Sequence, residues 1–265
     1  MADAWACPDQ AGREHLVRDD FTRVHYERLA DKYDENWAYS PEFIRWMTGG
    51  IQERLRLDPG DRVIDVGCGT GLYARGLAEH ASTVICVDPS QAMLEQLPAD
   101  DRLIPLHAGA EDLAEKRIQL PHDGYDAILL KEVVHHVADP SAVLAGLIRL
   151  LLPGGRILVA MLPTRIEYPL FDAALRLFRQ RQPDPEDIAT AMRDSGLAAE
   201  LTYDEFPLAF TADRYIRMVR SRYMSLLSSF DDTALEAGID EIRRRHPGPE
   251  LRFPDRFAFV LGAKE

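Results

Sequence analysis

The sequence predicts an α/β fold in which a mostly parallel, seven-stranded sheet forms the middle of a three-layer sandwich. Apolar runs of strand length alternate with helical segments between residues 61 and 162, which is typical of βαβ units. The first strand runs into a helix through a glycine-rich turn, as expected where an α/β sheet binds a ligand. Apolar residues make up 46% of the 265 residues, enough to form a core without disulfides or metals.

The N-terminal part predicts a helical arm. Residues 13–32 carry apolar side chains at helical spacing among charges. Ser40 followed by Pro41 is a typical N-cap with proline at the first helical position, so a second helix is expected to about residue 55. Gly49 and Gly50 allow an interruption of that helix.

The elements of the core follow in order. Strands are expected at 61–67, 83–88, 102–110, 125–131 and 155–162, and the helices between them at 71–81, 89–99 and 139–155. The last of these helices is predicted to close on Pro-Gly-Gly.

Beyond residue 163 the alternation is less regular. Helices are expected at 168–181, 184–196, 212–230 and 232–246, and strands at 198–206 and 256–264. The helix at 212–230 carries an apolar stripe at a spacing of three to four, formed by Ile216, Val219, Tyr223, Leu226 and Phe230.

We therefore expect a single domain in three parts. Residues 1–57 form an arm over the active site, 58–162 the ligand-binding core, and 163–265 the rest of the sheet with a helical lid at about 165–182 and 211–247. Both additions are expected over the carboxyl ends of the strands, where open α/β sheets bind ligands.

Charge and composition exclude several classes of protein. A formal charge of −13 disfavours a protein that grips nucleic-acid phosphates. The three cysteines have no metal-ligand spacing, so no metal site is predicted and reduced thiols are expected. No stretch resembles a signal peptide or a membrane span, so we expect a cytoplasmic protein with neither nucleic acid nor membrane as partner.

The glycine turn predicts the kind of ligand. Gly67, Gly69 and Gly71 alternate, but Leu72 stands where the dinucleotide fingerprint has its last glycine, and the Gly-Lys-Ser/Thr run of phosphate loops is absent. Asp65, two residues before the turn, would repel a pyrophosphate. The ligand is therefore expected to be uncharged or cationic at that point.

A second carboxylate ends the second strand. Asp88 is placed to accept hydrogen bonds from both hydroxyls of a ribose. A nucleoside that carries a cation and lacks phosphates satisfies Asp65 and Asp88 together, and S-adenosylmethionine is such a molecule.

At these positions the chain resembles the class I S-adenosylmethionine-dependent methyltransferases. The resemblance is carried, in order, by "VIDVGCGTG" (63–71), "CVDPS" (86–90), "GAEDL" (109–113), "YDAILLKEVVHHV" (125–137) and "LLPGGRILV" (151–159). It implies a Rossmann-like fold and membership of the small-molecule branch (methyltransferase type 11-like). From Arg165 onward the chain is more loosely similar to the part of that branch that includes trans-aconitate-type enzymes.

The resemblance also implies roles for residues around the cofactor. Asp65 would receive the methionine ammonium, Asp88 the ribose, and the backbone of Gly67, Cys68 and Gly69 would line the ligand. Ala110 and Glu111 would contact adenine, although Gly109 replaces the acidic or amide residue of many relatives and Glu111 has an alternative as an exposed turn carboxylate. The remaining predicted cofactor-binding residues are Pro89, Lys131 and Tyr33.

The acceptor is expected beside the end of the fourth strand. His135, with His136 second, is the predicted catalytic base; the alternative is that both rings simply pack at the start of a helix. Several arginines near the site suggest an anionic acceptor, unless they form an ordinary solvated helix face. The predicted substrate residues are Tyr26, Trp37, Arg165, Tyr168, Arg214, Arg222 and Tyr223.

The predicted function is methyl transfer from S-adenosylmethionine to a small molecule, with S-adenosylhomocysteine as product, by a monomer or homodimer. A protein that uses the cofactor structurally or for a cyclisation is the alternative, because its glycine turn would look the same. A protein or RNA methyltransferase would need a basic docking face or a recruiting domain, which the sequence does not show. Leu72 and Asp65 disfavour a nicotinamide-dependent oxidoreductase.

Overall fold

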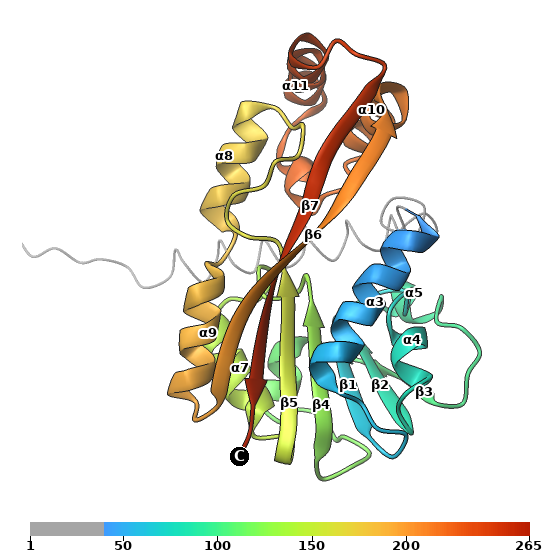
Figure 1. Cartoon of the computed structure of the whole chain (residues 1–265), viewed down its shortest axis with the longest axis vertical. Helices are drawn as coiled ribbons and strands as arrows, with labels where there is room; N and C mark the ends of the chain where they lie inside the picture. Colours follow the sequence, from blue (N-terminus) through green and yellow to red (C-terminus); the bar gives the residue numbers. More distant parts are fainter. Residues whose placement is uncertain (1–39) are drawn as a thin grey trace, which may run out of the picture.

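The computed structural model describes residues 40–265 and confirms the predicted α/β fold. A seven-stranded sheet has the order β3-β2-β1-β4-β5-β7-β6 and carries helices on both faces (Figure 1). The strands are β1 Arg62–Val66, β2 Thr83–Asp88, β3 Leu103–His107, β4 Tyr125–Lys131, β5 Leu151–Met161, β6 Ala198–Thr211 and β7 Glu250–Ala263. The helices are α3 Pro41–Leu55, α4 Ala74–Ala78, α5 Gln91–Leu94, α6 Ala110–Ala114, α7 Pro140–Ile148, α8 Asp172–Arg181, α9 Pro185–Asp194, α10 Ala212–Arg220, α11 Asp232–Arg245 and the 3-10 helix η2 Ser225–Ser229.

The first five strands are parallel. β2 and β3 are added on one side of β1, and β4 and β5 on the other, so the order of the strands reverses at β1. β1 pairs with β2 on one side and with β4 on the other. Such a reversal leaves a crevice outside the carboxyl ends of the two flanking strands, because their connections leave in opposite directions. The glycine turn after β1 therefore stands at the usual ligand-binding position of an open α/β sheet.

The two faces of the sheet bury separate cores. One contains Val63 and Leu129 beneath α3, and the other contains Ile64 and Ile128 beneath α6, α7 and α9. Successive side chains of a strand point to opposite faces. The central strands β1, β2 and β4 are consequently almost continuous apolar runs, as the sequence predicted for a sheet covered on both sides, whereas the edge strands β3 and β6 are largely exposed.

β6 and β7 form a hairpin much longer than the other strands. β5 pairs only with the Ala258–Ala263 part of β7, whereas β6 pairs with β7 along its whole length. The half of the hairpin that does not pair with β5 continues past the carboxyl ends of the parallel strands, where α8, α10 and α11 surround it (Figure 1). This upper part is where the sequence placed the lid.

Several predicted element boundaries are wrong. β6 continues to Thr211 instead of residue 206, and β7 begins at Glu250 instead of residue 256, because the two strands pair with each other beyond the edge of the parallel sheet. The helix expected at 139–155 ends at Ile148, and β5 begins at Leu151, because the backbone of Gly154 and Gly155 pairs with Lys264 at the end of the sheet. The helix expected at 212–230 ends at Arg220 and is followed by η2, since Arg222 adopts a left-handed φ of 58°. The interruption allowed at the glycine pair of α3 does not occur.

The helix predicted at 13–32 lies outside the described residues. Between residues 40 and 265, no helix is long and apolar enough to cross a membrane. The division of the chain into arm, core and lid remains an expectation.

Candidate functional site

The glycine turn brings bare backbone to the carboxyl edge of the sheet. Gly67, Gly69 and Gly71 all have positive φ, at 69°, 56° and 76°, a region that glycine adopts without steric cost. A Cβ at Gly67 would overlap the Cγ2 of Val133. The amides of Gly67 and Cys68 both donate to the carbonyl of Val87, at 2.7 and 3.0 Å, which fixes the turn against β2.

Asp88 supports the same turn from the end of β2. Its Oδ2 accepts from the backbone N–H of Gly69 at 2.9 Å, and its Oδ1 accepts from that of Ser90 at 2.8 Å. Burial raises the pKa of the Asp88 carboxyl, while these two N–H groups oppose the rise. Each carboxylate oxygen has a second lone pair, so Asp88 can still accept hydrogen bonds from a diol.

Asp65 is a buried carboxylate that lacks a hydrogen-bond partner among the described residues. It is 3% exposed, and no N–H, O–H or cation of residues 40–265 contacts its oxygens. Burial and the neighbouring Asp88 raise the pKa of Asp65 to about 7, against the opposing charge of Lys131. A buried charge without a partner is costly, so Asp65 needs a cationic or donor group from a ligand.

These residues fit a cationic nucleoside. Asp88 could accept hydrogen bonds from a diol and Asp65 could pair with an ammonium, while the positive-φ glycines between them carry no side chain that would obstruct the ligand. The same two carboxylates would repel a pyrophosphate, as the sequence indicated. When bound, S-adenosylmethionine supplies an electrophilic methyl on its sulfonium.

The predicted adenine-side residues lie beyond β3. Gly109 is the N-cap of α6 and donates its backbone N–H to Oδ2 of Asp112 at 2.9 Å, so the N3 carboxylate satisfies the N–H of the N-cap residue. Ala110 is buried and Glu111 is half-exposed at the start of that helix. The carbonyl oxygen of Pro89 lies 3.0 Å from Nε2 of His107, a hydrogen bond that links the end of β2 to the end of β3. Their contact with adenine remains a prediction.

The acceptor-side residues follow β4. The rings of His135 and His136 lie 4.0 Å apart between centroids. Lys131, at the end of β4, places its Nζ 4.9 Å from the ring centre of Tyr73 and 5.2 Å from that of Phe257. Glu132 turns away, since its Oε1 accepts from the backbone N–H of Leu162 at 2.7 Å. A catalytic role of the histidines remains a prediction.

In the lid, the predicted tyrosines are buried and two of the predicted arginines have other contacts. Arg222 pairs with Asp232 at 2.8 Å, and the Arg214 guanidinium lies 5.0 Å from the ring centre of Phe210. Tyr168 and Tyr223 are buried around a carboxylate that the sequence reading missed, Asp255. Arg165 follows β5 and is exposed.

The sequence contained a signal for Asp255. In "RFPDRFAFV", Asp255 shares the strand parity of Phe253 and Phe257, so it points inward with them. An inward carboxylate in an apolar strand is a candidate functional group.

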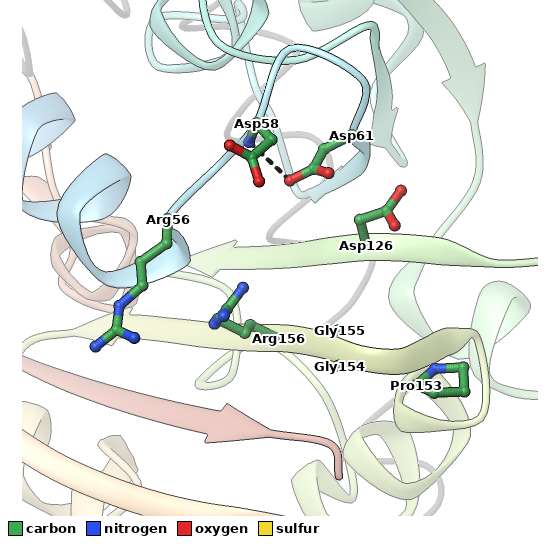
Figure 2. Close-up of a pocket in the computed structure, with 8 residues that line it drawn as sticks. All are labelled: Arg56, Asp58, Asp61, Asp126, Pro153, Gly154, Gly155 and Arg156. Carbon is green, nitrogen blue, oxygen red and sulfur yellow. Dashed lines mark hydrogen bonds between the residues drawn. The ribbon is translucent and has the colours of Figure 1, made fainter.

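Tyr26, Tyr33 and Trp37 lie outside the described residues, and their predicted roles remain predictions. A polar hollow elsewhere on the protein is a different feature (Figure 2). It is lined by Arg56, Asp58, Asp61, Asp126, Pro153, Gly154, Gly155 and Arg156. These residues surround the amino ends of β1, β4 and β5, opposite the glycine turn, so the hollow is not part of the candidate site.

Comparison with known proteins agrees with this geometry. Residues 64–159 match the family model described as "Methyltransferase domain". The chain is similar to the ubiquinone biosynthesis O-methyltransferase of Pseudomonas savastanoi, with 29% identity over 209 residues that span 68% of this chain and 85% of the relative.

Two solved structures share the fold. Phosphoethanolamine N-methyltransferase 2 of Haemonchus contortus, in complex with S-adenosyl-L-methionine, superposes with a TM-score of 0.56 at 17% identity over 90% of this chain and 60% of that one. The cyclase SpnF superposes with a TM-score of 0.55 at 18% identity over 82% of this chain and 79% of that one.

Proposed function

Because the chain belongs to the class I S-adenosylmethionine-dependent methyltransferases, we propose that it methylates a small molecule bound between the carboxyl ends of β4 and β5, the amino-terminal half of the antiparallel strand β7, and the lid. The observation that carries the proposal is the pair of buried carboxylates, Asp65 and Asp88, on either side of the glycine turn. Asp65 accepts from the methionine ammonium of the cofactor, and Asp88 accepts from its ribose.

The protein's part in the reaction is mainly to bind and orient. The glycine turn and Asp88 would hold the nucleoside end of the cofactor, and Asp65 would hold its amino-acid end. Alignment of the acceptor with the methyl carbon in a site that excludes water provides much of the acceleration in such transfers.

The names of the relatives and the contacts of the lid arginines indicate which class of acceptor to test first. The relative from Pseudomonas savastanoi is named as an O-methyltransferase of ubiquinone biosynthesis, which makes a hydroxyl the first acceptor to test. The anionic acceptor remains a prediction, but Arg222, one of the arginines on which it rested, is neutralised by Asp232. His135 stays the proposed base only if its removal slows the chemical step.

The experiment uses purified full-length protein, S-adenosylmethionine labelled on its methyl group, and a cell extract separated by size. Label in the small-molecule fraction, with one S-adenosylhomocysteine formed per methyl transferred, is the expected result, and mass spectrometry then identifies the acceptor. Label confined to the macromolecular fraction refutes a small-molecule acceptor. Cofactor binding without transfer to either fraction favours a structural or cyclase-like use, an activity that the name of one structural neighbour carries.

A further inference from the structure

Three charged side chains lie in a row on one face of the sheet. Asp65 shares the strand parity of Val63, Lys131 that of Leu129, and Asp255 that of Phe257 and Phe259; the apolar residues named here all belong to the core on the α3 side. β1, β4, β5 and β7 are neighbours in the sheet. The row therefore runs from the glycine turn toward the lid.

Asp255 is at the lid end of this row and has an oxygen without a partner. The residue is fully buried, and its Oδ1 accepts from the hydroxyl of Tyr168 at 2.5 Å. Oδ2 is equally buried and has no hydrogen-bond partner among residues 40–265. Buried polar atoms are nearly always hydrogen-bonded, so an unpaired carboxylate oxygen needs an explanation.

Asp255 lies in a cluster of aromatic side chains. The ring of Phe253 lies 5.2 Å from that of Tyr168 and 5.5 Å from that of Tyr215, between centroids. The hydroxyls of Tyr215 and Tyr223 lie 3.4 Å apart, and the Asp255 charge helps to raise the pKa of Tyr223. These rings come from the loop before α8, from the hairpin, from α10 and from the turn that follows α10. The segments predicted as a lid therefore supply the aromatic cluster that contains the carboxylate.

Lys131 does not neutralise Asp255 directly. Its charge lowers the pKa of Asp255, yet neither an ion pair nor a hydrogen bond joins the two side chains. Burial outweighs this and raises the pKa of Asp255 to about 7. The lysine lies toward Tyr73 and Phe257 instead, which leaves Oδ2 of Asp255 for another group.

We infer that Oδ2 of Asp255 binds the methyl acceptor by accepting a hydrogen bond from an O–H or N–H donor of an aromatic molecule, with Tyr168 holding the carboxylate in place. This inference rests on the proposed function and deepens it, because it specifies the acceptor class: a ring-sized molecule whose hydroxyl or amine points at Asp255. The carboxylate is on the acceptor side of the site and does not bind the cofactor. Tyr168 acts through Asp255 and is a positioning residue.

The test compares probes that differ only in the donor. Catechol carries two hydroxyls, and 1,2-dimethoxybenzene is its methylated counterpart without a donor. Binding of each to the protein saturated with S-adenosylhomocysteine is measured by ligand-observed NMR for the wild type, for Asp255→Asn and for Asp204→Asn. Asp204 is an exposed carboxylate on the neighbouring strand of the same hairpin and serves as the matched control.

We expect catechol to bind the wild type and Asp204→Asn at least about tenfold more tightly than its methylated counterpart, the range for a buried hydrogen bond to a charged group. Asp255→Asn, which preserves shape, should lose this preference while its affinity for S-adenosylmethionine by calorimetry is unchanged. Tyr168→Phe should weaken catechol binding less than Asp255→Asn.

Equal binding of the two probes to the wild type, equal catechol binding to wild type and Asp255→Asn, or no catechol binding at millimolar concentration overturns the inference. Weaker cofactor binding by Asp255→Asn overturns it as well, because Asp255 then belongs to the cofactor side. The proposed function fails separately, through the absence of methyl transfer by the wild type, so the two failures are distinguishable.

Discussion

Lowering the pH from 7.5 to 6 should weaken the binding of S-adenosylmethionine about tenfold. The reason lies in Asp65, because burial and Asp88 raise the pKa of this carboxyl to about 7 in the ligand-free protein. An ammonium binds the ionised carboxylate, so the protein must release a proton before it binds. With that pKa, the ionised fraction falls from roughly three quarters at pH 7.5 to about one tenth at pH 6.

The proton itself can be counted. Calorimetric titrations at pH 6, in two buffers with different ionisation enthalpies, should show nearly one proton released for each S-adenosylmethionine bound. The pH range stays below the usual pKa of an α-amino group, about 8, so the ligand's own ammonium remains largely protonated. Any additional release comes from Asp88, whose pKa is also raised by burial.

Asp65→Asn is the decisive variant. It should bind more weakly than wild type at pH 7.5 but lose much less affinity between pH 7.5 and 6, because the group that titrates has been removed. A wild type with the same affinity at both pH values, and with no proton exchange, refutes the assignment of the ammonium to Asp65.

Three further results are expected. In ligand-free protein, native Asp65 holds its proton over a range where the unfolded chain has lost it, so its contribution to the free energy of unfolding should fall by at most about 4 kcal/mol as pH rises from about 4 to 7. In urea titrations over this range, the change in the free energy of unfolding should therefore be more negative for the wild type than for Asp65→Asn by at most that amount. Gly67→Ala should destabilise the protein by more than about 1 kcal/mol, through its positive φ and overlap with Val133, whereas Gly49→Ala, in open space on α3, should be neutral or stabilising by up to about 1 kcal/mol. Asp88→Ala should weaken cofactor binding by roughly 1–3 kcal/mol in calorimetry, because the turn amide of Gly69 loses its acceptor as the ribose does; unchanged affinity would remove Asp88 from the site.

The parallel half of the fold was predictable because each strand is a short apolar run, and such runs follow from burial on both faces. Element ends were less predictable, since they depend on distant partners. "LLPGG" joins β5 because Lys264 pairs with its glycines, and Lys264 is more than a hundred residues away in the chain. No local pattern contains that information.

The cofactor side of the site was predictable for a related reason. Asp65, the glycine turn and Asp88 are close in sequence because they lie at the carboxyl ends of β1 and β2, two neighbouring strands joined by a single helical connection. The acceptor side is assembled from the end of β4, the loop before α8, and a hairpin that returns at the end of the chain. Asp255 reaches it only through the antiparallel pairing of β7 with β5, and that pairing cannot be read from spacing.

The buried charges on the cofactor side and on the acceptor side of the site are coupled through one lysine. Asp65, Asp88 and Asp255 are all buried, and the only buried or half-buried cation that acts on both Asp65 and Asp255 within residues 40–265 is Lys131. Burial lowers the pKa of Lys131, and the nearby carboxylates, Glu132 first among them, oppose that effect. One lysine cannot balance three carboxylates in a poorly solvated space. The ammonium and sulfonium of the proposed cofactor would add positive charge on the side of Asp65 and Asp88, so its binding would bring the site closer to charge balance.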